Sequence, residues 1–356
     1  MSDTRVSLVI PGRNCARTIR ACLDAAIAIQ RADRSPLGEI IFVDDGSTDE
    51  TPRILAEYPV TVLHGHGGGP GAARNIGWRA SSGRFAWFID SDCVAEPEAL
   101  ARLLVRIERS GTGERTGDDG RPDSSQVVGG VGGSYGNQCP SSLLACLIHE
   151  EIIARHRRMP REVNFLGGFN VLYRRDVLER VGGFDESRFN GPGSPGAEDA
   201  ELSYRVHAAG FRLLFEPESR VGHYHPTRLR RYLRAQRHHG YWRVALHMAH
   251  IGTAAGDAYS GVVDHAQPVL ALLIIACTPF AIGPTGQWAL LALGLILLGL
   301  QIPMTLSLLR RTRRVRYLAF VPLGVVRAFW RGIGMLQGLI GHAFHNAPDR
   351  SANKAG

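Results

Sequence analysis

The sequence predicts an α/β domain, built on a Rossmann-like mixed and mainly parallel sheet, followed by C-terminal membrane helices. Two observations predict this division. Short apolar runs alternate with amphipathic stretches over residues 6–215, whereas long runs of Leu, Ile, Ala and Gly crowd the part beyond Pro268. Strands that alternate with helices form a parallel sheet covered on both faces. Long uncharged runs are typical of helices in lipid.

The first half of the α/β domain follows a regular βαβ rhythm. Its first strand runs into the turn Pro11-Gly12-Arg13-Asn14, and its second stops at Asp44-Asp45-Gly46-Ser47-Thr48-Asp49, whose Ser, Thr and Asp side chains cap the next helix. In order, we expect a strand at 6–10, a helix at 16–32, a strand at 39–43, a helix ending at 58, a strand at 60–63, a glycine-rich loop at 64–71, a helix at 72–81, a strand at 85–89 and a helix at 97–110.

The second half resumes after residues 111–126, which contain nothing apolar and predict a mobile surface loop. There we expect strands at 127–135, 165–173 and 211–215, and helices at 141–157, from 176 to the Gly182-Gly183 pair, and at 198–209. Residues 1–226 therefore form one domain.

Three C-terminal segments differ in composition from this domain. Residues 227–260 are basic and carry aromatic side chains, which suits an amphipathic helix at a membrane interface; a solvated charged helix is the alternative. Within the membrane segment 261–345, residues 288–309 are long enough to span, and 268–282 form a short span, a re-entrant piece or a buried helix. The third run, 317–344, is long but contains Arg327, Arg331 and His342, so we expect it to be amphipathic or packed against its neighbours. Residues 346–356 form a polar tail.

Charge supports membrane attachment. The net charge is +8, from 41 basic and 33 acidic residues, and nearly all the basic residues are arginine. Arginines gather beside the apolar segments, at residues 228–237 and 310–316, which suits lipid headgroups rather than nucleic acid. The loop 283–287 has no basic residue, so we expect a hairpin with both ends cytoplasmic.

The N-terminus and the cysteines also predict a cytoplasmic catalytic domain on the cytoplasmic membrane. Residues 1–5 are polar and lead straight into a strand, without a signal peptide. The six cysteines include no C-x-x-C pair, so we expect reduced thiols rather than disulfides or a zinc site.

Carboxylates follow two of the predicted strands directly. Asp44 and Asp45 end one strand, and Asp90-Ser91-Asp92 ends another. Ligands of open α/β sheets bind at this edge, and an Asp-x-Asp pair can share a hard divalent cation with substrate phosphates. A turn followed by a helix cap is the alternative interpretation.

A glycine-rich loop, Gly67-Gly68-Gly69-Pro70-Gly71, opens the helix that carries Arg74 and Asn75. Backbone N–H groups and the positive end of a helix favour phosphates, and a guanidinium can grip a diphosphate. A flexible connector is the alternative. The spacing matches neither a dinucleotide fingerprint nor a Walker A loop, which argues against NAD and ATP.

Together, Val43-Asp44-Asp45-Gly46-Ser47-Thr48-Asp49, Gly71-Ala72-Ala73-Arg74-Asn75-Ile76-Gly77 and Ile89-Asp90-Ser91-Asp92 resemble the family 2 glycosyltransferases of GT-A fold, over about residues 5–225. The resemblance implies a nucleotide-diphospho-sugar donor and Mg²⁺ or Mn²⁺ as cofactor. It implies donor contacts near the nucleoside, along the diphosphate and at the ribose edge, made by Pro11, Asp44, Asp45, Gly71, Arg74, Asn75, Asp90 and Ser91. Asp90 and Asp92 are the metal ligands that it implies.

Later motifs extend the resemblance to the acceptor side. Gly167-Gly168-Phe169-Asn170 and Glu198-Asp199 look like the family's acceptor segment and its E-D pair, which implies that Gly168 and Glu198 lie on the acceptor side and that Asp199 is the catalytic base. A helix-capping pair is the alternative for Glu198-Asp199. His223 is a further candidate metal ligand, and His225 another, although neighbouring histidines are often ordinary surface.

Residues 236–242 only echo the Gln-x-x-Arg-Trp signature of processive synthases, with Gln236 as an acceptor-side candidate. We therefore expect an inverting transferase that moves one sugar to a hydroxyl of a lipid-linked or membrane-delivered acceptor, saccharide acceptors included, in cell-envelope glycan or glycolipid synthesis. Two alternatives remain: a nucleotidyltransferase that makes the activated sugar, and a membrane-anchored sugar-nucleotide binder without activity.

Overall fold

The computed structural model of the chain describes residues 6–109, 127–186, 196–250 and 258–345. They belong to two compact units. Unit 1 comprises Met1–Arg228 with Asp257–Tyr259, and unit 2 comprises Leu229–Gly256 and Ser260–Gly356. The loop predicted at 111–126 and the tail predicted at 346–356 lie outside the described residues.

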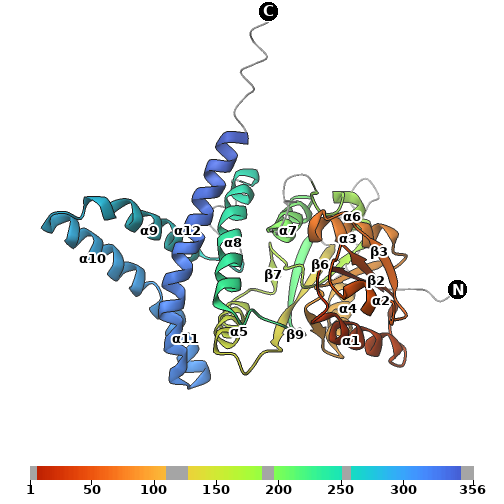
Figure 1. The fold of residues 1–356 in the computed structure, drawn as a ribbon. Helices are drawn as coiled ribbons and strands as arrows, with labels where there is room; N and C mark the ends of the chain where they lie inside the picture. Colours follow the sequence, from red (N-terminus) through yellow and green to blue (C-terminus); the bar gives the residue numbers. More distant parts are fainter. Residues whose placement is uncertain (1–5, 110–126, 187–195, 251–257, 346–356) are drawn as a thin grey trace, which may run out of the picture. The chain divides into compact units, whose positions relative to one another are not determined.

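Unit 1 is built on a mixed sheet, in which the described residues supply nine strands in the order β3-β2-β1-β4-β8-β6-β9-β5, with β7 beside β9 (Figure 1). The strands are β1 (Val6–Gly12), β2 (Leu37–Asp44), β3 (Thr61–His64), β4 (Phe85–Ile89), β5 (Cys93–Ala95), β6 (Val128–Asn137), β7 (Glu162–Val163), β8 (Asn170–Arg174) and β9 (Arg212–His223). The longer ladders, β1–β2 and β6–β9, are parallel, and β8 runs antiparallel between β4 and β6. The predicted α/β class is confirmed.

Helices pack on both faces of this sheet because alternate strand residues point to opposite sides. Leu8 and Trp87 belong to the apolar cluster shared with α1 and α4, whereas Val9 and Phe88 belong to the cluster shared with α3, α6 and α7. The helices of unit 1 are α1 (Ile19–Arg31), α2 (Thr51–Leu55), α3 (Gly69–Ala80), α4 (Ala99–Arg109), α5 (Leu143–His156), α6 (Arg175–Val181) and α7 (Glu198–Ala208).

The last strand differs most from its prediction. β9 extends to His223 instead of ending at residue 215, because its second half pairs with β6 and β5 although it contains Glu216, Pro217 and Glu218. Because these residues interrupt the apolar run, the hydrophobic pattern does not predict the second half of this strand. The extension brings His223 opposite Cys93 of the unpredicted strand β5.

Unit 2 is helical. Its elements are α8 (Leu229–Ala249), α9 (Val262–Cys277), the short helix η3 (Thr278–Phe280), α10 (Pro284–Gly299), α11 (Ile302–Thr312), η4 (Val315–Ala319) and α12 (Phe320–His345). In the part of the chain that the structure describes, three stretches are long and apolar enough to cross a membrane: Val262–Phe280, Pro284–Thr312 and Val315–Gly341, with mean hydropathies of 1.5, 2.1 and 1.3. The span predicted at 288–309 is divided between α10 and α11 at Leu300 and Gln301, ahead of Pro303, which a helix tolerates only in its first turn.

Candidate functional site

The predicted acidic residues meet at one edge of the sheet. Gly12 pairs with Asp44 at the end of β1 and β2, and Pro11 is buried one position earlier. On the other side of β1, Val9 pairs with Phe88, so Asp90 follows β4 at the same edge. The carboxyl ends of these parallel strands therefore place Asp44 and Asp90 on the ligand-binding side of the sheet.

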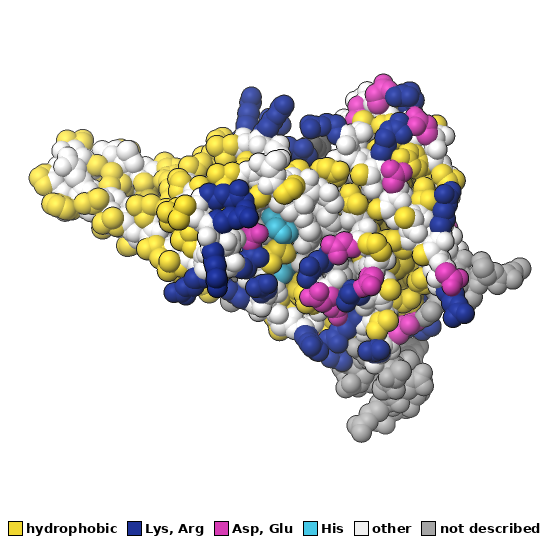
Figure 2. Space-filling view, turned by 90° about the horizontal axis from the view of Figure 1, so that it is seen from below, with side chains coloured by type: hydrophobic (Ala, Val, Ile, Leu, Met, Phe, Trp, Pro, Cys, Tyr) yellow, Lys and Arg dark blue, Asp and Glu magenta, His cyan; other side chains and the backbone are white. Residues whose placement is uncertain are grey.

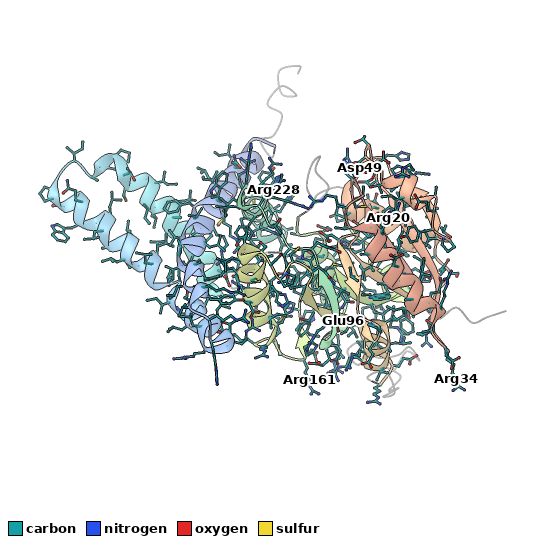
Figure 3. All side chains as sticks on the ribbon, turned by 60° about the horizontal axis from the view of Figure 1, so that its bottom comes forward. Arg20, Arg34, Asp49, Glu96, Arg161 and Arg228 are labelled. Atoms are coloured by element: carbon teal, nitrogen blue, oxygen red, sulfur yellow. The ribbon has the colours of Figure 1, made fainter. Side chains whose placement is uncertain are left out.

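The loop after β1 and the loop after β2 are hydrogen-bonded to each other at this edge. The side chain of Asn14 accepts a hydrogen bond from the Thr48 N–H at 2.8 Å, and the Asn14 N–H donates to Ser47 Oγ at 2.9 Å. Asp49, labelled in Figure 3, accepts from the Ala16 N–H at 3.2 Å. These bonds fix the loop that begins with Asp44 and Asp45.

Asp45 holds the glycine-rich loop rather than leaving it free. Its carboxylate accepts hydrogen bonds from the backbone N–H groups of Gly67, Gly68 and Gly69, at 2.9, 3.1 and 2.7 Å. The carboxylate of Asp44 accepts from the Ser47 N–H at 2.9 Å. The prediction that these glycine N–H groups are open to phosphate is therefore wrong for this structure, since a protein carboxylate already occupies them.

Asn75 is also a structural residue here. It has no exposed surface, and its amide bonds to Trp78 Nε1, to Glu186, and to both backbone groups of Phe184, at 2.5–2.9 Å. These hydrogen bonds use both the oxygen and the nitrogen of the amide, and the predicted donor contact of Asn75 stays a prediction. Asn75 joins α3 to the segment that follows α6.

Arg74 joins two acidic groups that are distant in the sequence. Its guanidinium donates to Asp90 Oδ1 at 2.7 Å and to Glu198 Oε1 at 2.9 Å, with only 4% of the side chain exposed. The Phe184 ring lies 5.5 Å from the guanidinium carbon. Arg74 therefore joins the end of β4 to the start of α7, and its predicted contact with a donor diphosphate stays a prediction.

Two glycines make room for this arrangement. A Cβ at Gly168 would lie 2.9 Å from a guanidinium nitrogen of Arg74, and one at Gly71 would lie 3.4 Å from the Glu198 side chain. The Gly168 N–H donates to Asp199 Oδ2 at 3.1 Å. Gly168 thus contacts the predicted base Asp199 directly and lies beside the guanidinium that pairs with Glu198.

Glu198 and Asp199 are paired acids in different surroundings. Burial and the charge of Asp199 raise the pKa of Glu198 and Arg74 lowers it, with a net rise to about 7. Burial also raises the pKa of Asp199, against the hydrogen bonds from Gly168 and Ala200. Because Glu198 is engaged in the ion pair with Arg74, Asp199 is the better placed of the two to accept a proton.

A second group of potential ligands lies where β5 meets β9. His223 Nε2 is 3.4 Å from Asp92 Oδ1, and Cys93 lies within the same cluster. Burial raises the pKa of the Cys93 thiol, which disfavours the thiolate that binds metals. A carboxylate and an imidazole that face each other fit a divalent cation, so the donor set is compatible with the predicted site.

A chain of histidines continues behind His223. Its Nδ1 lies 2.8 Å from Nδ1 of His225, whose Nε2 lies 3.4 Å from Nδ1 of His149. Burial lowers the pKa of His225 to about 3, so this ring is neutral near pH 7. His225 therefore lies behind His223 and contacts its far nitrogen, an arrangement typical of residues that orient a metal ligand.

Residues 7–182 match the family model described as Glycosyl transferase family 2. The chain carries a family 2 glycosyltransferase domain. The predicted resemblance to the family 2 glycosyltransferases is therefore confirmed.

The relatives of this chain are distant in sequence. A pre-mycofactocin glycosyltransferase of Mycobacterium tuberculosis is 28% identical over 268 residues, which cover 73% of this chain and 51% of the relative. The putative glycosyltransferase EpsH of Bacillus subtilis is 38% identical over 29% of this chain and 30% of its own length. The matched part of the chain thus spans about half the length of the first relative and less than a third of the second. Among solved structures, the mannosyltransferase PcManGT of Pyrobaculum calidifontis, in complex with GDP-Man and Mn²⁺, is 19% identical, with a TM-score of 0.46 over 97% of this chain and 88% of its own.

Two predicted site residues remain to be placed. Ser91 is partly exposed between the two aspartates, at the open edge of the sheet. Gln236 belongs to unit 2, where it is buried and its side-chain oxygen accepts a hydrogen bond from Arg331 Nε at 2.7 Å. Its predicted role at the acceptor stays a prediction.

Proposed function

We propose that the chain is an inverting, metal-dependent glycosyltransferase that moves one sugar from a nucleotide-diphospho-sugar to a hydroxyl of a lipid-linked or membrane-delivered acceptor. The observation that carries this proposal is the Asp90–Arg74–Glu198 bridge beside Asp199, because it joins the donor edge of the sheet to a carboxylate of raised pKa. Cell-envelope glycan or glycolipid synthesis is the expected setting.

In this mechanism, Asp199 receives the proton of the acceptor hydroxyl as its oxygen bonds to the anomeric carbon. The bond from that carbon to the diphosphate oxygen breaks on the opposite face, and the electron pair leaves with the nucleoside diphosphate. The stereochemistry inverts. Arg74 holds Asp90 and Glu198 in position, and Gly168 orients Asp199 through its N–H.

Asp92 and His223 would hold the cation, with Asp90 near them on the donor side. A bound Mg²⁺ or Mn²⁺ would neutralise charge on the departing diphosphate. Asp44 and Asp45, buried at the end of β2, would shape the nucleoside end of the site, with Pro11 and Ser91 beside them.

Attachment to the cytoplasmic membrane, with unit 1 facing the cytoplasm, completes the proposal. It rests on the three candidate spans of unit 2 and on the contrast between the uncharged loop 283–287 and the five arginines of residues 310–316. A cytoplasmic domain has access to nucleotide sugars and to lipid-linked acceptors.

The test is a product assay on purified membranes that contain the full chain, with a panel of radiolabelled nucleotide sugars, with and without Mn²⁺. We expect a nucleoside diphosphate as the released product and the sugar label in the lipid extract. Release of pyrophosphate would instead indicate a nucleotidyltransferase, and the absence of turnover with every donor would indicate a non-catalytic binder.

A further inference from the structure

Unit 2 contains an arm that is apolar on its outside. The arm consists of α9, η3 and α10, and no charged residue occurs between Val269 and Leu309. Phe280, Ile282 and Trp288, at its outer end, are 77%, 91% and 69% exposed. Figure 2 shows this arm covered by hydrophobic and uncharged side chains. Large apolar surfaces of this kind mark contact with lipid or protein.

α12 cannot be considered without α8, because the two helices pack closely side by side. A Cβ at Gly334 would collide with the carbonyl oxygen of Arg237, and a Cβ at Gly240 would collide with that of Arg331. Further along, Gly338 contacts Tyr241 and Val244. Residue numbers rise together in both helices, so α8 and α12 are parallel and share one environment along their length (Figure 1).

α8 is too charged for hydrocarbon. On the register set by these glycines, its exposed Arg230, Arg231 and Arg234 come level with the middle of the candidate span Val315–Gly341. α12 itself adds Arg327, which is buried within unit 2, and Arg331, whose Nε donates a hydrogen bond to Gln236 of α8. On insertion scales, one arginine at the centre of a span offsets the gain from roughly five leucines. The described part of α12 exposes four large apolar side chains, namely Val326, Leu336, Leu339 and Ile340, so crossing is unfavourable for the pair.

The orientation of the arm suits a different arrangement. α9 and α10 lead sideways from the α8–α12 pair in Figure 1, so the arm can point into a bilayer while the pair lies along its surface. The described residues of unit 2 contain twelve arginines and one carboxylate, Asp264. This excess of positive charge matches the phosphates of anionic lipids.

We propose that the third candidate span does not cross the membrane: α8 and α12 lie along the surface against anionic headgroups, and only the α9–α10 arm enters the hydrocarbon. This rests on the proposed membrane attachment and is independent of the sugar chemistry. Under this arrangement, both ends of α12 lie on the same side of the membrane as unit 1.

Reporter fusions test the arrangement in a Gram-negative host. Green fluorescent protein, which fluoresces only in the cytoplasm, and alkaline phosphatase, which is active only in the periplasm, are each fused after Gly356 of the full chain. The same reporters fused after Arg316 are matched controls for the side on which α12 begins. An N-terminal fluorescent fusion reports the side of unit 1.

We expect both fusion sites to be fluorescent and without phosphatase activity, as at the N-terminus. Phosphatase activity and loss of fluorescence after Gly356, with a fluorescent fusion after Arg316, would overturn the proposal, because α12 would then cross. Each outcome gives a positive signal from one reporter. Release of the chain from membranes by alkaline carbonate would overturn both this proposal and the membrane attachment, without affecting the proposed transfer reaction.

Discussion

At the scale of single residues, the protonation of the Glu198-Asp199 pair should control activity. Both pKa values are raised by burial, that of Glu198 to about 7, and a neutral carboxyl group cannot take a proton from the acceptor. Activity is therefore lost as pH falls and gained as pH rises through the pKa of the pair. We expect a plot of kcat/KM against pH to have its acidic limb above the ~4 of a free carboxyl group.

Changing Glu198, the acid next to Asp199, tests whether this pH dependence comes from Asp199. Glu198→Gln removes a negative charge next to Asp199 and releases Arg74, and both changes favour the ionised form of Asp199. The acidic limb should therefore move to lower pH, whatever the loss in maximal rate. An unchanged limb would show that another group titrates.

The affinity for Mn²⁺ should depend on both His223 and His225, at the end of β9. His223→Ala removes a ligand, whereas His225→Ala removes only the ring behind it, which should weaken Mn²⁺ binding by about 10- to 100-fold. Calorimetric titration of the full chain with Mn²⁺ measures both effects. His207→Ala, on the exposed surface of α7, is the control. Equal affinity in all three variants would place the metal elsewhere.

At the scale of elements, the pattern of apolar residues predicts where a strand or helix lies better than it predicts how long that element is. β4 was expected at residues 85–89 and occurs there, because five buried residues end at a run of polar ones. The strand predicted at 211–215 continues to His223 as β9. Its composition does not reveal this extension, because pairing with β6 produces it. Helix α10 ends earlier than the apolar run because of the break before Pro303.

The close packing of α8 on α12 makes its own prediction. Gly334→Ala places a methyl group against the carbonyl oxygen of Arg237, so it should destabilise unit 2 by about 1–3 kcal/mol. Gly294→Ala is the matched control, since nothing lies within 4 Å of its added Cβ and alanine favours a helix. Thermal unfolding in detergent compares them. Equal melting temperatures would mean that the helices are not in contact.

At the scale of the whole molecule, the motifs predicted which residues matter but not how they are connected. The partners of Arg74 lie 16 and 124 positions away, so their bridge follows from the fold alone. The same holds for the hydrogen bonds of Asn75 to Phe184 and of Asp45 to Gly69, whose partners lie 109 and 24 positions away. The positions of Asp44 and Asp90 could be predicted because strands that run parallel place their carboxyl ends at the same edge of the sheet.

The most direct test of the account replaces the proposed base. Asp199→Asn keeps the shape of the side chain but cannot accept the proton, so transfer should fall by about 10²- to 10⁴-fold while donor binding stays unchanged. Asp176→Asn, at the first turn of α6 with a side chain 64% exposed, is the matched control and should keep full activity. Sugar transfer by Asp199→Asn at the wild-type rate would contradict the account.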